Sequence, residues 1–382
     1  MNRAGMKADL PAHPRITGVT VTPVRVPLRE AMVTALGRID ASEYAILELT
    51  CENGVTGLGE ISLIWHGNGA RLGVEVAPLL REAIVGLPLL NRTQVMASAR
   101  ESLQFGRHSL TALAAVEMAV LDAQGKHLGV PAHALLGGAT RDDVLLSMSL
   151  SAGTADAMLA QARRFVEDGF RALKIKGLRD GEHIERIATR LRREFPEVAL
   201  RVDLNMACRT AKEALAIARR LEPVGIRSLE QPLPANDLAG LAFLRAQTSI
   251  PLMLDESVWD ERDAALAIAQ QAGDIVNIYV AEAGGIAAGL RIADQCAQAG
   301  WEVAVGSMPE LAIGTSAAAQ LAVALPQLEH PSDVAGFRYH ATDVVHHALR
   351  IHDGRLLRPT APGLGVELDR DALDAHTMEV LR

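Results

Sequence analysis

The sequence predicts an α/β fold, a TIM-type (β/α)7–8 barrel that follows an N-terminal α+β domain, and three observations support this prediction. From residue 144 onward, short apolar runs alternate with alanine-rich helical stretches in units of about 25 residues. Seven or eight such units favour a closed barrel over an open parallel sheet. No G-x-G-x-x-G motif follows the first strand, so the open doubly wound sheet that binds dinucleotides is the weaker alternative.

The first third of the chain has a different order of elements. We expect strands at residues 16–26, 43–51 and 57–64, the last two joined by the turn sequence Glu52-Asn53-Gly54. Helical patterns follow, and the strongest spans residues 109–126, where apolar residues recur on one face. The sequence PAHALLGG at residues 131–138 then interrupts the pattern. Strands followed by helices indicate an α+β domain.

The barrel elements follow in regular order. We expect its strands at residues 145–150, 172–176, 200–204, 228–231, 252–254, 275–279 and 302–305. Helices are expected between them at residues 155–167, 181–194, 211–221, 237–245, 261–270 and 286–299. After residue 326 the pattern becomes irregular, although residues 351–356 predict a small hairpin. We therefore divide the chain into a disordered tail (1–13), the α+β domain (14–138), the barrel (139–330) and a C-terminal segment (331–382) that completes the barrel and returns to the first domain.

The composition argues against several classes of protein. The 382-residue chain is 49% hydrophobic and 22% charged with a net charge of −8, and it has no long basic stretch, so no nucleic-acid partner is expected. It contains no apolar run of about 18 residues, which argues against a membrane span. The N-terminus lacks the apolar core of a secretory signal, and the three cysteines lie far apart. We therefore expect a cytoplasmic protein with reduced thiols.

Charged residues stand at the ends of four consecutive barrel strands. These strands end in the sequences Lys174-Ile175-Lys176, Asp203-Leu204-Asn205, Glu230-Gln231-Pro232 and Asp255-Glu256-Ser257. Side chains alternate along a strand, so Lys174 and Lys176 point to the same face. The steps from Lys176 to Asp203, from Asp203 to Glu230 and from Glu230 to Asp255 are 27, 27 and 25 residues, which is one βα unit each time. The four charges therefore meet at the carboxyl ends of the strands, where such barrels carry their active sites.

Three carboxylates in one small pocket would repel one another unless a cation lies among them or some are protonated. Oxygen ligands from Asp203, Glu230 and Asp255 suit Mg²⁺, which keeps open positions for water and substrate. Spacing alone does not choose between Asp255 and its neighbour Glu256. Neither histidine nor cysteine stands at these strand ends, which argues against zinc. A single carboxylate would be read as a helix cap or an ion pair, but three beside a Lys-x-Lys pair favour a metal site.

The two lysines complete this chemistry. Only five of the 38 basic residues are lysines, and Lys174 and Lys176 are two of them. A neighbouring ammonium and a divalent cation both lower the pKa of a lysine, which can then act as a general base near neutral pH. If the carboxylate of a small substrate binds Mg²⁺, removal of its α-proton gives an enolate whose charge the metal stabilises. The alternative role for Lys174 is an ion pair with the carboxylates.

The pattern from Lys174-x-Lys176 to Asp255-Glu256-Ser257 resembles the enolase superfamily and, within it, the muconate-lactonizing subgroup of the mandelate racemase/muconate lactonizing enzyme family. The resemblance covers nearly the whole chain and extends to residues 131–138, 169–176, 283–286 and 307–315. It implies that Asp203, Glu230 and Asp255 bind Mg²⁺ and that Lys176 is the base. Lys174 would lower the pKa of Lys176 and contact the substrate carboxylate.

The resemblance also implies that the N-terminal domain caps the barrel. Two of its loops, at residues 28–42 and 63–73, would cover the barrel mouth. The family is commonly dimeric or larger, so a homo-oligomer is expected. Glu310 lies where this subgroup often has an active-site glutamate. Residues expected to contact the substrate or to lie just behind it are Asn205, Glu256, Glu310, Trp65 and His66.

The chain departs from the subgroup at one position. The subgroup places a second lysine at the end of the sixth strand, and here that position is Tyr279. Tyrosine, with a pKa near ~10, is a poor base at neutral pH. The sequence therefore favours a reaction that needs one base, either a cycloisomerisation, as in a muconate cycloisomerase, or a syn-dehydration. The alternatives are an amino-acid or dipeptide racemase or epimerase in which Tyr279 replaces the second lysine, and a catalytically silent metal-binding relative.

Overall fold

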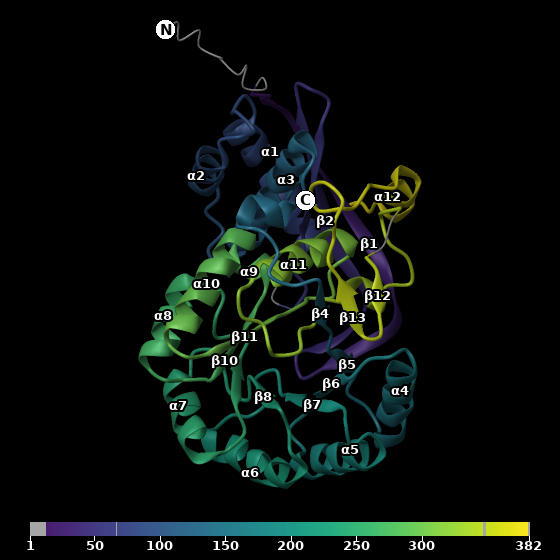
Figure 1. Ribbon diagram of the computed structural model, residues 1–382, viewed down its shortest axis with the longest axis vertical. Coiled ribbons are helices and arrows are strands. Elements are labelled where there is room, and N and C mark those ends of the chain that lie inside the picture. Colours follow the sequence, from purple (N-terminus) through teal and green to yellow (C-terminus); the bar gives the residue numbers. More distant parts are fainter. Residues whose placement is uncertain (1–12, 66, 347–348, 381–382) are drawn as a thin grey trace, which may run out of the picture.

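The N-terminal lobe consists of an antiparallel sheet covered by helices. The computed structural model describes residues 13–65, 67–346 and 349–380, so most of the predicted tail lies outside the described residues. The sheet has the order β1-β2-β3 and contains β1 (Ile16–Thr34), β2 (Gly37–Cys51) and β3 (Thr56–Ile61). The helices are α1 (Gly69–Ile84), α2 (Arg92–Ser102) and α3 (His108–Leu128). This confirms the predicted α+β domain, shown in purple and blue in Figure 1.

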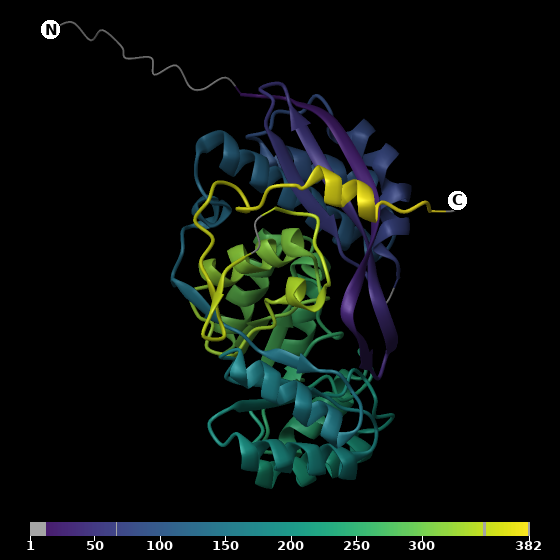
Figure 2. The same cartoon turned by 90° about the vertical axis from the view of Figure 1, so that its right-hand side faces the viewer.

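The first two strands form a long ribbon where the sequence had suggested a loop at residues 28–42. Their pairing continues as far as Thr34 opposite Gly37, with a register shift between Pro27 and Met32. In Figure 2 this purple ribbon runs down beside the barrel. Its far end is fixed there because the Val33 amide donates to Ser151 Oγ at 2.8 Å. The expectation of a loop was wrong, since continued antiparallel pairing satisfies the backbone groups of these residues.

The C-terminal lobe contains a curled parallel sheet of seven strands in the order β11-β10-β9-β8-β7-β6-β5. The strands are β5 (Met148–Leu150), β6 (Ala172–Lys176), β7 (Ala199–Asp203), β8 (Ser228–Glu230), β9 (Leu252–Leu254), β10 (Ile275–Ile278) and β11 (Glu302–Val305). An extended segment joins the two edges of this sheet, because Ser332 pairs with Leu146 and its hydroxyl accepts from the Val305 amide at 3.0 Å. The predicted barrel-like fold is confirmed.

Helices surround this sheet in Figure 1. They are α4 (Ala155–Glu167), α5 (Gly181–Glu194), α6 (Ala211–Leu221), α7 (Leu238–Gln247), α8 (Glu261–Ala269) and α10 (Ile286–Gln298). The first five begin at a Thr or Asp whose side chain accepts from the first turn, which stabilises a helix start. A further helix, α11 (Ala312–Ala324), was not predicted. All its residues are buried, so it lacks the amphipathic period that marks the other helices.

The C-terminal segment returns across both lobes. β12 (Ile351–His352) and β13 (Arg355–Leu357) form the predicted hairpin, and β13 pairs with β4 (Asp143–Leu145). The last helix, α12 (Arg370–His376), lies beside β1, and Thr377 pairs with Val24. Short helical turns occur at η1 (Ala132–Leu136), η2 (Glu222–Val224) and η3 (Gly336–Tyr339). Among the described residues, no helix combines the length and the apolar character that crossing a bilayer requires.

A buried histidine joins the two lobes. The Ala341 amide donates to the Pro27 carbonyl at 2.9 Å, and the neighbouring His340 places Nε2 2.9 Å from Ser42 Oγ of β2. The imidazole is 1% exposed, and burial lowers its pKa to about 4. Since the unfolded chain takes up this proton near pH 6.5 and the folded chain does not, acid favours unfolding.

We expect the free energy of unfolding to fall by about 3 kcal/mol between pH 6.5 and pH 4 through His340 alone. Urea unfolding at several pH values measures this loss. His340→Gln should flatten the pH dependence by that amount, because glutamine does not titrate. The control is His352→Gln, at a side chain 76% exposed, which should leave the slope unchanged. A His340→Gln profile parallel to that of the wild type would contradict this assignment.

Candidate active site

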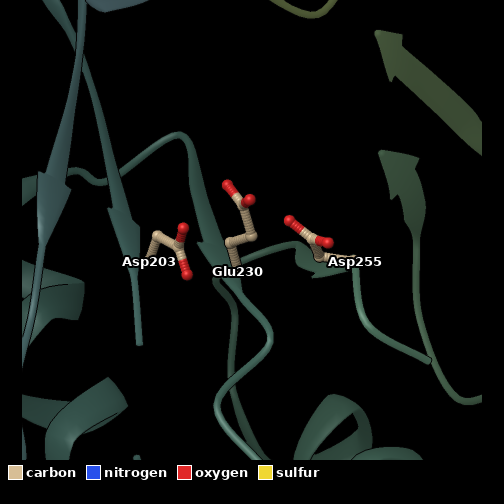
Figure 3. A group of neighbouring side chains, drawn as sticks. All are labelled: Asp203, Glu230 and Asp255. Carbon is tan, nitrogen blue, oxygen red and sulfur yellow. The ribbon is translucent and has the colours of Figure 1, made fainter. Parts of the chain in front are cut away.

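Three acidic side chains converge at the carboxyl ends of neighbouring strands. Asp203 ends β7, Glu230 ends β8 and Asp255 follows β9 directly. Their carboxylates offer oxygen atoms that all lie within 4.8 Å of one another, and all three residues are buried. Figure 3 shows the three side chains next to one another at these strand ends. The one-unit spacing in the sequence therefore corresponds to one cluster in space.

The negative charges of these buried carboxylates favour binding of a cation. Burial and the charge of Glu230 raise the pKa of Asp203, and burial with the charges of Glu256 and Glu230 raises that of Asp255 well above its usual value. Ionising all the carboxylates without a cation is therefore unfavourable. A set of hard oxygen donors, with no nitrogen or sulfur ligand in the cluster, fits a divalent metal ion of the Mg²⁺ type.

The two lysines of β6 lie on the same side as the carboxylates, as their alternation predicted. Lys176 Nζ is 2.5 Å from Asp203 Oδ2 and donates to Asn205 Oδ1 at 3.1 Å. Lys174 Nζ lies deeper, 2.6 Å from Asp333 Oδ2 and 3.2 Å from Glu230 Oε1. Burial alone would lower the pKa of Lys174, but Asp333 and Glu230 outweigh burial and raise it. Lys174 is therefore a fixed positive charge, and Lys176 is the lysine at the pocket surface.

Two charged residues beneath the cluster were missed by the sequence analysis. Arg201, which is fully buried in β7, donates from Nη2 to Glu230 Oε2 at 2.8 Å and from Nη1 to Asp333 Oδ1 at 3.1 Å. Asp333 in turn holds Lys174. With these cations beside it, the pKa of Glu230 is lowered although burial opposes this shift. Arg201 and Lys174 therefore keep Glu230 ionised at the centre of the site.

Tyr279 follows β10 and faces the cluster. Its hydroxyl donates to Asp255 Oδ2 at 2.7 Å, and Asn277 Nδ2 lies 3.4 Å from the same hydroxyl. Burial and the charge of Asp255 raise the pKa of Tyr279 well above its usual value near 10. The phenol is therefore a neutral hydrogen-bond donor that orients a carboxylate of the cluster.

The other expected residues divide into those at the pocket and those away from it. Asn205 donates from Nδ2 to Glu256 Oε1 at 3.1 Å, and both residues line the pocket together with Trp65. Glu310 is buried but accepts from its own loop, from the Met308 amide at 2.9 Å and from the Ser307 hydroxyl, and it is not among the pocket-lining residues. His66 lies outside the described residues.

A small pocket lies above the carboxylates, and Lys174, Lys176 and Asp255 are among the residues that line it. Both lobes contribute to it, since Met32 and Leu36 of the ribbon and Trp65 close it from the side of the N-terminal lobe. The barrel contributes the two lysines, Tyr279 and the acidic residues. The N-terminal lobe therefore caps the barrel, partly through strands rather than through loops alone.

Comparisons with known proteins agree with this architecture. A family described as "Enolase C-terminal domain-like" matches residues 157–372, and one described as "Mandelate racemase / muconate lactonizing enzyme, N-terminal domain" matches residues 16–137. The chain is 30% identical to L-Ala-D/L-Glu epimerase of Bacillus subtilis over 92% of this chain and 96% of that protein. It is 31% identical to o-succinylbenzoate synthase of Geobacillus kaustophilus over 93% of this chain and 94% of that protein.

The structural comparison leads to the same family. Muconate lactonizing enzyme from Pseudomonas fluorescens, complexed with muconolactone, superimposes with a TM-score of 0.91 at 28% identity, covering 96% of this chain and 100% of that one. These relatives bear the names of three different reactions at similar identity, so they do not choose among them. The C-terminal family match alone covers more than half of the chain. The chain belongs to the mandelate racemase/muconate lactonizing enzyme family of the enolase superfamily.

Proposed function

We propose that this enzyme removes the proton α to the carboxylate of a small substrate, with Lys176 as its only base, in a syn-dehydration or a cycloisomerisation. The observation that supports this most directly is the pairing of Lys176 with Asn205 and Asp203 at the surface of the pocket. Asp203, Glu230 and Asp255 would hold a Mg²⁺ ion, whose charge would stabilise the negative charge formed when the α-proton leaves.

The contacts around Lys176 fix the direction of its amino group, as a base that removes one particular proton requires. Asn205 accepts from the ammonium and is itself fixed through Glu256, so the lysine has one preferred direction. Lys174, held by Asp333 and Glu230, supplies a fixed positive charge in the same pocket as Lys176. The same charge would attract the substrate carboxylate.

The choice of one base rests on Tyr279. Among the described residues, the only lysines that line the pocket are Lys174 and Lys176. Tyr279 holds its proton because its pKa is raised, and that proton is donated to Asp255. A racemase or epimerase would need Tyr279 to accept and return the α-proton, which this hydrogen bond opposes.

Deuterium exchange separates these reactions. In D₂O, with candidate substrates drawn from hydroxyprolines, dipeptides, N-acyl amino acids, acid sugars and muconates, a one-base enzyme should introduce deuterium with a single stereochemistry. The measurement is ¹H NMR of both enantiomers of each chiral compound and, for the achiral muconates, of the lactone that forms. Deuterium appearing in both enantiomers would instead establish a two-base epimerase and overturn the proposal.

We expect Tyr279→Phe to lower turnover by about 10- to 100-fold without abolishing α-proton exchange by Lys176, since a hydrogen bond to a charged group contributes about 1.5–3 kcal/mol. The lost bond is the one to Asp255 Oδ2. Turnover and exchange are measured on the same substrate. The matched control is Tyr339→Phe, in the same pocket, because the hydroxyl of Tyr339 accepts from the Ser149 amide and touches no carboxylate of the cluster. If Tyr279→Phe had the same kinetic constants as the wild type, the hydroxyl would have no part in the reaction.

A further inference from the structure

One acidic residue in the pocket has no role in the chemistry described above. Glu282, in the short helix α9 (Val280–Ala283), lines the pocket and is 2% exposed. Its Oε2 atom finds no hydrogen-bond partner among the described residues. Glu256, at the end of the neighbouring strand β9, is 5% exposed, and its Oε2 is likewise without a described partner. A buried carboxylate oxygen without a partner is costly, so two of them in one pocket indicate that something else binds there.

The backbone holds Glu282 in this place. α9 follows Tyr279 directly, and the Ala283 amide donates to the Tyr279 carbonyl at 2.8 Å. The helix ends at Gly284 and Gly285, whose φ angles of +86° and +131° favour glycine. A Cβ at Gly285 would lie 2.1 Å from Glu117 Oε2 of α3, so the chain passes very close to the N-terminal lobe. Glu282 therefore cannot leave the pocket without moving this tightly packed link.

The charges in and under the pocket do not balance. The acidic groups are Asp203, Glu230, Asp255, Glu256, Glu282 and Asp333. The basic groups are Lys174, Lys176 and Arg201. With all six acids ionised and Lys176 protonated, a divalent ion would leave one negative charge in excess, and a bound substrate carboxylate would make it two.

Among the described residues, neither Glu256 nor Glu282 forms an ion pair with Lys174, Lys176 or Arg201. Lys174 and Arg201 are held by Glu230 and Asp333, and Lys176 by Asp203. The positive charge of Arg107 acts on Glu282 from outside the pocket, but its guanidinium is paired with Asp263. Burial and the charge of Glu256 raise the pKa of Glu282 well above its usual value, as expected for a carboxylate that lacks a counter-ion.

We propose that Glu282, together with Glu256, binds a primary or secondary ammonium group of the substrate, so that this enzyme acts on carboxylic acids that also carry an amine. An ammonium supplies both the missing positive charge and two or three N–H donors for the orphan oxygens, whereas a hydroxyl supplies one donor and no charge. The inference rests on the proposed function. A substrate carboxylate bound to the Mg²⁺ ion that Asp203, Glu230 and Asp255 would hold brings the amine within reach of Glu282. Acids with a second carboxylate in place of the amine are expected to bind poorly, which favours dehydration of an amino acid over cycloisomerisation of a muconate.

Matched ligand pairs test this proposal on the Mg²⁺-loaded full-length enzyme. The pairs are L-alanine and L-lactate, L-proline and (S)-tetrahydrofuran-2-carboxylate, and glycyl-L-alanine and glycolyl-L-alanine. Within each pair the ammonium is replaced by an uncharged oxygen, and dissociation constants come from NMR titration at pH 7.5. The wild type should bind the amine at least ten-fold more tightly in at least one pair.

Glu282→Gln, which preserves shape and removes the charge, should lose this preference by at least ten-fold while its affinity for the oxygen analogue is kept. Glu282→Lys should reverse the preference and improve binding of succinate. The control Glu261→Gln changes a partly exposed carboxylate that is paired with Arg291, and it should keep the wild-type preference. No preference in any pair, or an equal preference in Glu282→Gln, overturns the proposal. The dissociation constants are measured without turnover. If α-proton exchange proved independent of Lys176, the proposed function would be refuted, but the binding data would still test whether Glu282 binds an ammonium group.

Discussion

Lys176→Ala should abolish α-proton exchange, with a rate at least about 10⁴-fold below wild type, the upper end of what a general base contributes. Lys176 is the lysine at the pocket surface, and its ammonium contacts Asp203 and Asn205. The fold should survive, because Lys176 is less buried than Lys174 and its removal leaves Asp203 beside Lys174, 3.7 Å away. Exchange is followed in D₂O by NMR, and Mg²⁺ binding is measured in parallel.

The control is Lys212→Ala, which removes an exposed lysine of α6 and should keep the wild-type rate. Lys174→Ala is a different experiment. Lys174 is held by Asp333 and Glu230, so its loss should weaken carboxylate binding and move the acidic limb of the pH–rate profile. Wild-type exchange in Lys176→Ala would place the base elsewhere and remove the main support for the proposed function.

The carboxylate cluster was predictable because barrels repeat. Charged residues at the ends of successive strands, one βα unit apart, must meet at one rim, and this placed Asp203, Glu230 and the pair Asp255-Glu256 together. The choice of Asp255 over Glu256 came from the family resemblance. Alternation along β6 likewise placed Lys174 and Lys176 on one side. Apart from the choice of Asp255, these predictions depend only on local periodicity and on the direction of parallel strands.

Other features depend on long-range packing that local periodicity does not contain. Arg201 lies two residues before Asp203 and therefore on the same face of β7, so its charge within an apolar strand was a signal that the sequence analysis did not use. Asp333 comes from the irregular region after residue 326, where no period indicates its direction. Glu282 precedes the glycine pair that resembled the family, but only the packing of Gly285 against Glu117 explains why it stays in the pocket.

The ribbon shows the opposite error, because the family resemblance suggested a loop that the residues do not form. A loop was expected at 28–42, yet strand pairing continues to Thr34, and the pocket wall contains Met32 and Leu36. Glu310 was expected at the substrate or just behind it; its carboxylate accepts from the Met308 amide, and it is not among the residues that line the pocket. A position shared with a family therefore does not determine the direction of a side chain.

Asp203→Asn should weaken Mg²⁺ binding and remove activity while the fold is retained. The substitution keeps the shape of the side chain but removes one ligand charge from the cluster and the partner of Lys176 at 2.5 Å. Without metal, the unfolding transition should stay close to that of the wild type, because the lost contact with Lys176 is offset by the lost repulsion from Glu230, which raises the pKa of Asp203 in the wild type.

The metal-dependent part of stability distinguishes this site from an ordinary ion-pair network. At a Mg²⁺ concentration 100 times the dissociation constant, binding should stabilise the wild type by about 2.7 kcal/mol, and Asp203→Asn should show little of this gain at the same concentration. Thermal unfolding with and without Mg²⁺, together with calorimetric titration, measures both quantities. Asp142→Asn, at a side chain 87% exposed, is the control and should respond to Mg²⁺ as the wild type does. Because three carboxylates share the ion, an Asp203→Asn variant that kept full activity in the presence of a chelator would mean that the cluster serves structure and that the proton is removed without a metal.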